Sequence, residues 1–559
     1  MIAIHPQYLN LASLFNGRLF QIPDYQRAYS WTSKQRADLF GDIQHAFQKG
    51  SDAGHFMAAI VCLRRKKVNI YTNEFQTLDV VDGQQRLTTI VLLLKTIALK
   101  AVDADKKQKK LVEELDDLLV KPGSNELLLL QTNHDSSHYF SNYLIRGESA
   151  PSDEAKTIAD RELLGAIEDC SDFVDSWTAS GNALTELVAL LKNRLFLLLH
   201  EIEDEEAVYT VFEVLNSRGL EVSWFDRLKS ILMGAAFELA GSANSSSIRE
   251  LHSVWRDIYA IIGLRQGMST ESLRFAATLR NASAPSRPLS ESAAVDLLRS
   301  EATSIKSIKT LAQWLLKVTK ACDEVASSSR TNAVTRIVQA RLLATAIYLR
   351  SDLSSQERAE LLAIWERVTF RIYGMFGNDS RKRVGEFVRL AWSVVNEKLS
   401  APKIKAGIRS IGKDFPIEDA VWQLENTNCY EGWEDELRYF LFRYEEHLAK
   451  KAGQKFSNEQ WEKIWLVSPS KSIEHIMPQS KAAVKQKHRL GNLVLLPPNL
   501  NSKLQDLDPK NKADDYHNTG LLQAIEVAAK VKKANRWTKD AISQREAALL
   551  KWAKSEWSD

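Results

Sequence analysis

Two neighbouring residues near the carboxyl end of the chain have side chains suited to acid–base chemistry. Glu474 and His475 stand in the stretch SIEHIMPQ, and Pro478 ends the short strand that SIEHI predicts. The stretch NLVLLP, residues 492–497, predicts a second strand, and NLNSKLQ follows it as a turn entering a helix. A strand, loop, strand, helix unit of this kind brings an acidic residue, a histidine and an asparagine to one metal ion.

Hydrolysis of a phosphodiester is the chemistry that these side chains fit. The reaction needs a base for the attacking water and a cation near the leaving oxygen, roles that a neutral histidine and a divalent metal supply. We therefore expect His475 to be the base, with Glu474 and Asn501 as oxygen ligands that favour Mg2+ or Mn2+ over zinc. Asn499 competes with Asn501 for the ligand role. The alternative is an ordinary strand end in which His475 only caps a neighbouring group.

The order of these residues resembles the pattern of the HNH, or His-Me finger, nucleases. In that pattern an acidic residue and a histidine are followed by an asparagine about fifteen residues on and a second one nine further. Asn492 and Asn501 follow His475 in this order, with a slightly long first gap of 17 residues. The resemblance implies that Asn492 braces the loop and His475, and that Asn501 is a metal ligand. Glu474 stands where the family often has Asp.

A second set of polar residues stands where a predicted strand turns into a helix. The stretch DVVDGQQRLTT places Asp82 and Gly83 at the turn, and Gln84, Gln85 and Arg86 begin the helix. The free N–H groups and positive dipole end of a helix suit a phosphate, which Arg86 would also bind, while Asp82 would hold a metal or a water. The chain has no GxxxxGKS or GxxxxGKT stretch, which excludes a Walker A loop.

Two further stretches carry polar residues beside aromatic or helical patterns. IPDYQRAYSW, residues 22–31, offers Gln26 and Arg27 among flat aromatic surfaces that suit a base, although aromatic clusters more often form core. VFEVLNSRGLEVSWFDRLKSILM, residues 211–233, predicts a helix that stops near Gly219 and a second that begins at Ser223. The polar residues around this break, which capping and a surface ion pair explain equally well, are Asn216, Arg218, Asp226 and Lys229.

Together, IPDYQRAYSW, VVDGQQRLTT and FEVLNSRGL resemble the amino-terminal domain of the GmrSD family of modification-dependent, type IV restriction endonucleases. The HNH-like unit, with Trp537 and Trp552 after it, resembles the nuclease domain of the same family, which includes sensors of phosphorothioated DNA. The resemblance implies a ParB/sulfiredoxin-like amino-terminal fold that binds or hydrolyses a nucleoside triphosphate, with GTP, UTP, CTP and ATP all open. The implied nucleotide site consists of Gln26, Arg27, Asp82, Gly83, Gln84, Gln85 and Arg86.

The length and the changes of pattern predict a multidomain chain, mainly α with α+β parts. We expect an α+β ParB/sulfiredoxin-like domain over 1–240, a helical middle domain over 241–451 and an HNH ββα-metal domain over 452–559. GSANSSS, residues 241–247, predicts a linker, and NASAPSRPLS, residues 281–290, predicts a loop.

Composition narrows the class of protein. With 44% apolar and 26% charged residues the chain is a globular protein, and no export signal or run of about 18 apolar residues is present, so we expect a cytoplasmic protein without membrane spans. Four widely spaced cysteines without a CxxC pair predict reduced core thiols. From residue 453 onward, 18 Lys and Arg stand against 12 Asp and Glu, which fits a polyanion partner or a solvated surface. The basic stretches 481–489 and 530–537 fit contacts with phosphates and a solvated helix face equally well.

We therefore expect an antiphage nuclease in which nucleoside triphosphate in the amino-terminal domain regulates a Mg-dependent nuclease acting on modified double-stranded phage DNA. A single site of this kind cuts one strand at a time, so double-strand cleavage requires a homodimer or two nicks. The alternatives are a nucleotide-switched DNA-binding or partner-binding protein with a weak or inactive nuclease domain, and an RNA-cutting toxin.

Overall fold

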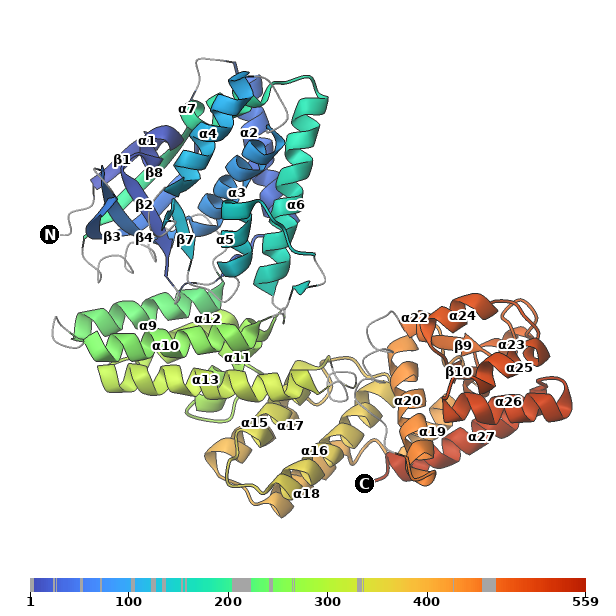
Figure 1. Cartoon of the computed structure of the whole chain (residues 1–559). Helices are drawn as coiled ribbons and strands as arrows, with labels where there is room; N and C mark the ends of the chain where they lie inside the picture. Colours follow the sequence, from blue (N-terminus) through green and yellow to red (C-terminus); the bar gives the residue numbers. More distant parts are fainter. Residues whose placement is uncertain are drawn as a thin grey trace. The chain divides into compact units, whose positions relative to one another are not determined.

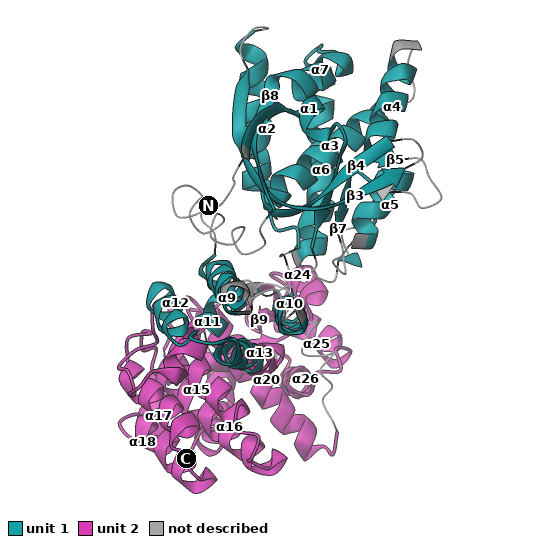
Figure 2. Ribbon diagram, turned by 90° about the vertical axis from the view of Figure 1, so that its left-hand side faces the viewer, with its two compact units in different colours: residues 1–273, 291–319 teal, residues 274–290, 320–559 magenta. Residues whose placement is uncertain are grey.

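The computed structural model contains two compact units, which Figure 2 colours separately. Unit 1 comprises Met1–Leu273 and Glu291–Thr319, and unit 2 comprises Arg274–Ser290 and Lys320–Asp559. The residues described are 5–23, 26, 28–50, 54–70, 73–101, 106–121, 127–132, 137–151, 154–155, 158–203, 223–240, 245–263, 265, 267–328, 334, 336–425, 427–454 and 469–559. The predicted boundaries at residues 240 and 451 lie inside these units, and the division into three domains stays a prediction.

A mixed six-stranded sheet forms the centre of unit 1. Its order is β1 (His5–Asn10), β8 (Leu195–Ile202), β3 (His55–Ile70), β4 (Asn73–Asp82), β2 (Arg18–Ile22) and β7 (Leu130–Thr132). The pairs β1–β8 and β3–β4 are antiparallel, and β8–β3, β4–β2 and β2–β7 are parallel. The α+β character predicted for this part of the chain is confirmed, whereas the specific ParB-like fold stays a prediction.

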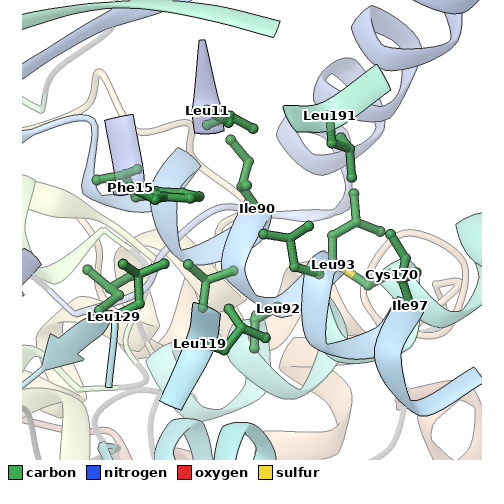
Figure 3. Packing of buried hydrophobic residues seen from close by; sticks show 14 of the residues in the cluster. Leu11, Phe15, Ile90, Leu92, Leu93, Ile97, Leu119, Leu129, Cys170 and Leu191 are labelled. Atoms are coloured by element: carbon green, nitrogen blue, oxygen red, sulfur yellow. The ribbon is translucent and has the colours of Figure 1, made fainter. Parts of the chain in front are cut away.

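Helices pack around this sheet in unit 1. They are α1 (Leu11–Phe15), α2 (Ser33–Gln48), α3 (Gln84–Lys100), α4 (Lys106–Leu119), α5 (Ser137–Arg146), α6 (Ile158–Ala179) and α7 (Leu184–Arg194), with a separate pair of short strands, β5 (Val120–Lys121) and β6 (Leu127–Leu128). Helix α3 packs against α4 and α6 and is buried on nearly all sides. Figure 3 shows Ile90, Leu93 and Ile97 of α3 in this core. Its amino-terminal turn is therefore held by packing.

The region predicted to be helical, residues 241–451, has helices and no strand among its described residues. Helix α9 (Trp224–Ala240) precedes it, and the helices within it are α10 (Ser245–Ile262), α11 (Met268–Arg280), α12 (Glu291–Ser300), α13 (Ile305–Ser327), α15 (Val338–Tyr348), α16 (Ser355–Thr369), the π-helical turn η2 (Phe370–Met375), α17 (Val384–Asn396), α18 (Ala401–Gly412), α19 (Ile417–Leu424) and α20 (Glu434–Lys451). The predicted loop 281–290 lies between α11 and α12, as expected. The linker prediction for 241–247 is partly wrong, because α10 already begins at Ser245. The amphipathic pattern that follows draws these serines into the helix.

The last part of unit 2 has the predicted order of a strand, a loop, a strand and a helix. Its elements (Figure 1) are α22 (Pro469–Ser472), β9 (Ile473–His475), α23 (Val484–Lys487), the 3-10 turn η3 (Leu490–Asn492), β10 (Leu493–Leu495), α24 (Pro498–Leu504), α25 (Pro509–His517), α26 (Leu522–Ala534) and α27 (Lys539–Glu556). The pair of strands has apolar clusters on both faces. Ile473 and Leu493 join the cluster that holds Trp552 and Trp557, whereas Val494 joins the one that holds Trp537.

Two expectations from composition can be compared with the described residues. Cys62, Cys170, Cys322 and Cys429 are all buried and free, which confirms that they are core thiols. Within the same residues, no helix combines the length and the apolar character that crossing a bilayer demands.

Candidate functional site

Strand β9 carries the predicted acidic residue and histidine at its end. β9 pairs antiparallel with β10, with His475 opposite Leu493 and Glu474 opposite Val494. Pro498 in the first turn of α24 suits a helix start, because its missing N–H group has no partner there in any helix. This local chain geometry gives a strand–strand–helix unit. Because successive strand residues point to opposite faces, Glu474 and His475 face different surroundings.

Close packing against α27 holds the turn between the two strands. An ideal Cβ on Gly491 would lie 2.0 Å from the carbonyl oxygen of Ile542, so only glycine allows η3 to come this close. On either side, Arg489 Nε donates to Glu546 at 3.1 and 3.2 Å, and Arg545 Nη1 donates to the Leu493 carbonyl at 2.7 Å. The turn that leads into β10 is therefore held firmly against α27.

The ring of His475 lies among polar and aromatic groups from three segments. Its Nε2 lies 3.0 Å from Nδ1 of His488, and Gln479 Nε2 donates to its Nδ1 at 3.3 Å. The ring of Tyr430 meets that of His475 edge to face, with centroids 4.7 Å apart, and stacks on His488 at 5.3 Å. Burial lowers the pKa of His475 to about 3, and the charge of Lys487 acts in the same direction. A neutral imidazole, the form that accepts a proton, is therefore present at neutral pH.

Asn492 ties together the two ends of the connection between β9 and β10, one next to each histidine. Its Oδ1 accepts the Met477 backbone N–H at 2.8 Å, and its Nδ2 donates to the carbonyls of Met477 at 3.1 Å and Lys487 at 2.9 Å. It is fully buried. All of these hydrogen bonds hold backbone groups next to the histidines, which is the geometry of a bracing residue.

Glu474 is engaged by groups that the sequence analysis did not identify. The fully buried ammonium of Lys512, on α25, pairs with Glu474 Oε1 and also donates to the carbonyl of His475 at 3.2 Å. Tyr516 donates to the same carboxylate oxygen at 3.1 Å. Burial raises the pKa of Glu474, while Lys512 and Tyr516 oppose that shift. The buried charge is thus compensated within the protein.

The remaining predicted metal ligand is also engaged with the backbone. Asn501 Nδ2 donates to the carbonyls of Lys471 and Ile473, both at 3.0 Å, and its competitor Asn499 is exposed. Across the described part of the chain, no three His, Cys, Asp or Glu side chains gather as a metal site. With Glu474 paired to Lys512, this arrangement does not fit a metal ion held directly by Glu474 and Asn501.

The amino-terminal motif forms the predicted strand-to-helix turn. Asp82 is the last residue of β4, and Gly83 has a φ of 89°, a left-handed conformation that glycine adopts without strain. An ideal Cβ on Gly83 would lie 3.0 Å from Ile60 Cγ1, so the space is also restricted. The turn therefore delivers the amino-terminal N–H groups of α3 to one fixed place.

The stretches IPDYQRAYSW and DGQQR come together at this turn. Gln85 Oε1 accepts the Ser30 backbone N–H at 2.7 Å, and its Nε2 donates to the Ala28 carbonyl at 3.2 Å. Gln26 Nε2 donates to the carbonyl of Val81 at 3.4 Å. Gln84 is buried as well. Gln85 and Gln26 hold the two segments together, and contact of the three glutamines with a nucleotide stays a prediction.

Arg86 lies on a flat aromatic surface next to this turn. Its guanidinium carbon lies 5.5 Å from the centroid of the Trp31 ring. Burial lowers the pKa of Arg86, and the charges of Asp82 and Asp42 oppose that effect. Arg27 lies outside the described residues.

Other predicted residues divide between core, helix cap and surface. Tyr29 is buried, and its hydroxyl lies 2.8 Å from Thr89 Oγ1, so here the core interpretation of the aromatic cluster holds. Ser223 accepts the Asp226 backbone N–H at 3.2 Å, which confirms the predicted helix start. Asn216 and Arg218 lie outside the described residues.

The basic stretches offer fewer exposed charges than their composition indicates. In 481–489, Lys481 pairs with Asp508 at 2.7 Å, and Arg489 is buried against Glu546. In 530–537, Lys532 pairs with Asp514 at 2.7 Å, and Trp537 is buried. Phosphate contact by the other lysines stays a prediction.

Sequence reasoning missed the residues that surround Glu474 and His475. His488 directly precedes the predicted turn in the stretch HRLGNLVLL, residues 488–496, so a second histidine at this place was the available signal. Tyr430, Glu431, Lys512 and Tyr516 come from distant segments and had no such signal.

Comparisons with protein families give a match at each end of the chain. The family described as the GmrSD restriction endonuclease N-terminal domain matches residues 11–233, which include both glutamine-bearing stretches. The family described as the GmrSD restriction endonuclease C-terminal domain matches residues 417–552, which include β9, β10 and α24. No curated protein matches the chain.

Proposed function

The chain belongs to the GmrSD restriction endonuclease family, and from this premise we propose that His475 is the centre at which it cuts modified foreign DNA. Membership makes it a DNA-binding nuclease of the type IV restriction kind. The observation that carries the assignment of the centre is the position of the buried His475 ring, with its Nε2 3.0 Å from Nδ1 of His488 and its Nδ1 beside the amide of Gln479. A ring nitrogen that is unprotonated at neutral pH and held in a fixed place can accept a proton from water.

In the proposed reaction, His475 takes a proton from the attacking water. The water oxygen then bonds to phosphorus, the bond from phosphorus to the 3′ oxygen breaks, and the 3′ oxygen leaves with the electron pair and takes a proton from solvent. Asn492 keeps the two ends of the β9–β10 connection, next to His475 and His488, in place during this step. The rigid turn at Gly491 gives the same support from the β10 side.

A divalent cation, Mg2+ or Mn2+, belongs to the proposal because of the HNH-like residue pattern. It would neutralise charge on the phosphate. No step of the proposed reaction uses this ion, because Glu474 is paired with Lys512. Thermal unfolding with and without Mg2+ measures its binding independently of cleavage.

A nucleoside triphosphate is the proposed regulator in unit 1. The turn at Gly83 presents the amino-terminal N–H groups of α3, and Arg86 lies beside the flat ring of Trp31. A helix amino terminus suits phosphates, and an aromatic ring suits a base. The proposal covers GTP, UTP, CTP and ATP alike, and binding or hydrolysis of the nucleotide controls cutting in unit 2.

The deciding experiment is a nicking assay with purified full-length protein and magnesium. Glucosylated, phosphorothioated and unmodified DNA are compared, each with and without nucleoside triphosphate, next to His475→Ala and the control His517→Ala, which alters an exposed histidine. We expect modification-dependent cutting that His475→Ala abolishes and His517→Ala keeps. Equal cutting by His475→Ala would show that the centre lies elsewhere.

A second candidate is a nucleotide-switched DNA-binding or partner-binding protein with a weak or inactive nuclease domain. The pairing of Glu474 with Lys512 favours it, because that pairing occupies the acidic residue of the HNH-like set. Retained DNA binding without cleavage under any nucleotide or metal condition would support this reading.

A further inference from the structure

His475 is the first member of a chain of polar groups that leads away from the strand. Its Nε2 lies 3.0 Å from Nδ1 of His488, and Nε2 of His488 lies 3.5 Å from Oε1 of Glu431. The two histidines are buried, whereas the Glu431 side chain is 67% exposed. The three groups therefore connect the candidate base to a carboxylate near solvent.

The loop that carries Glu431 is itself held in one conformation. Asn428 accepts the backbone N–H groups of Tyr430 and Glu431 at 3.0 and 3.1 Å, and its Nδ2 donates to Glu431 Oε2 at 2.8 Å. The buried Cys429 donates its backbone N–H to the carbonyl of His488 at 2.8 Å. This leaves Oε1 of Glu431 as the carboxylate oxygen that faces His488.

The direction of the contacts determines where the protons lie. A carboxylate only accepts, so Glu431 favours a proton on the nitrogen nearest to it, Nε2 of His488. A neutral His488 with that proton has a lone pair on Nδ1, which accepts from Nε2 of His475. His475 then has its own lone pair on Nδ1. Gln479 agrees independently, since its amide N–H group donates to that same Nδ1.

We propose that His488 and Glu431 are positioning residues, which fix the tautomer of His475 that has its proton on Nε2 and its lone pair on Nδ1. This inference rests on the proposed role of His475 as the base. Nδ1 has one lone pair, so the exposed Gln479 amide moves away when water binds there. When Nδ1 then takes a proton from the water, the ring becomes positively charged, and Glu431 stabilises that charge through His488. A histidine in the wrong tautomer would present an N–H group to the water and could not accept its proton.

The test compares replacements that keep or remove the acceptor at position 488. His488→Asn places an amide oxygen near the position of Nδ1, whereas His488→Leu keeps the bulk without an acceptor. In single-turnover nicking we expect His488→Leu to lower the rate roughly 10- to 100-fold with little change in KM, and His488→Asn to restore most of that loss. Glu431→Gln, at an exposed side chain, should lower the rate less, with Glu418→Gln as the matched control.

A double-variant comparison separates positioning from general damage to the fold. In the His475→Ala background, His488→Leu should cause no further loss of rate, because the residue acts through His475. A full additional loss in that background, or a normal rate for His488→Leu alone, would overturn the proposal.

A spectroscopic measurement makes the result independent of cutting. In full-length protein with 15N-labelled histidine, the ring signals lost in His475→Ala belong to His475. We expect them to show a protonated Nε2 in the wild type and a mixture of tautomers in His488→Leu. A protonated Nδ1 in the wild type would refute the proposal. If His475→Ala cuts normally while the tautomer is as expected, the proposed base is wrong and the positioning of the ring stands.

Discussion

Replacement of Lys512 by methionine tests how Glu474 is held in the fold. The Lys512 ammonium is fully buried, and within the described part of the chain it donates to Glu474 Oε1 and to the carbonyl oxygen of His475. Methionine has a similar length and no charge, so Lys512→Met leaves a buried carboxylate with Tyr516 as its hydrogen-bond donor. Breaking a buried ion pair in this way costs about 3–5 kcal/mol. The melting temperature of unit 2 should fall by on the order of 10 °C.

The assay is urea denaturation and thermal unfolding, both followed by tryptophan fluorescence. The transition that shifts in the variant is assigned to unit 2. The double variant Glu474→Gln/Lys512→Met should recover most of the loss, because neither charge remains buried. A loss of unfolding free energy below about 1 kcal/mol for Lys512→Met would refute the reasoning. So would a loss in the double variant equal to the sum of the losses in the two single variants. Stabilisation of Lys512→Met, but not of the wild type, by Mg2+ would show that the freed carboxylate binds the ion.

Three further changes have outcomes that the structure determines. Gly491→Ala should lower the free energy of unfolding by about 3 kcal/mol or more, because the new Cβ would meet the Ile542 carbonyl. The control Gly41→Ala, at a helical site with open space around it, should not destabilise the protein. Equal stability of the two variants in urea denaturation would contradict this prediction. Below pH 6.5 the unfolded chain binds a proton at His475, whereas the folded chain does not bind it until about pH 3. The free energy of unfolding should therefore fall by about 1.4 kcal/mol for each pH unit as the pH drops through this range. His475→Gln should remove that slope in denaturation curves from pH 7 to 4.5, and an unchanged slope would count against a neutral buried ring. Trp31→Ala should weaken nucleoside triphosphate binding in calorimetry without slowing nucleotide-independent cutting, and unchanged affinity would place the nucleotide elsewhere.

The strands, turns and helix starts of both candidate sites could be predicted from the sequence, because the spacing of nearby residues determines them. A strand ending in Glu474-His475 and a second one before α24 are fixed by apolar runs and prolines, and the structure has both. Asn492 was predicted to brace the loop, and its three hydrogen bonds to backbone groups have that geometry. The turn at Gly83 followed from the change of a strand pattern into a helical one.

The partners of these residues did not follow from the sequence, because tertiary packing supplies them. Lys512 meets Glu474 across a sequence separation of 38 residues, and no periodicity connects α25 to β9. The same holds for the loop of Glu431, which reaches His488 only because α20 and α27 share an apolar core with β9. The pairing of Arg86 with Trp31 depends on how the loop before α2 folds back on α3.

The hydrogen bonds of Asn492 have a consequence for how the connection between β9 and β10 can vary in length. The Ile476 N–H donates to the Asn492 carbonyl at 2.9 Å, and the Asn492 side chain donates to the Lys487 carbonyl. These hydrogen bonds join the two ends of the connection and involve no residue of its middle. Near the middle, Val484 is 90% exposed. The entropy of closing a loop grows only slowly with its length, about 0.6 kcal/mol for each doubling. Extra residues inserted beside Val484 should therefore leave the two histidines in register, which makes this loop the natural place to graft a longer segment onto the protein.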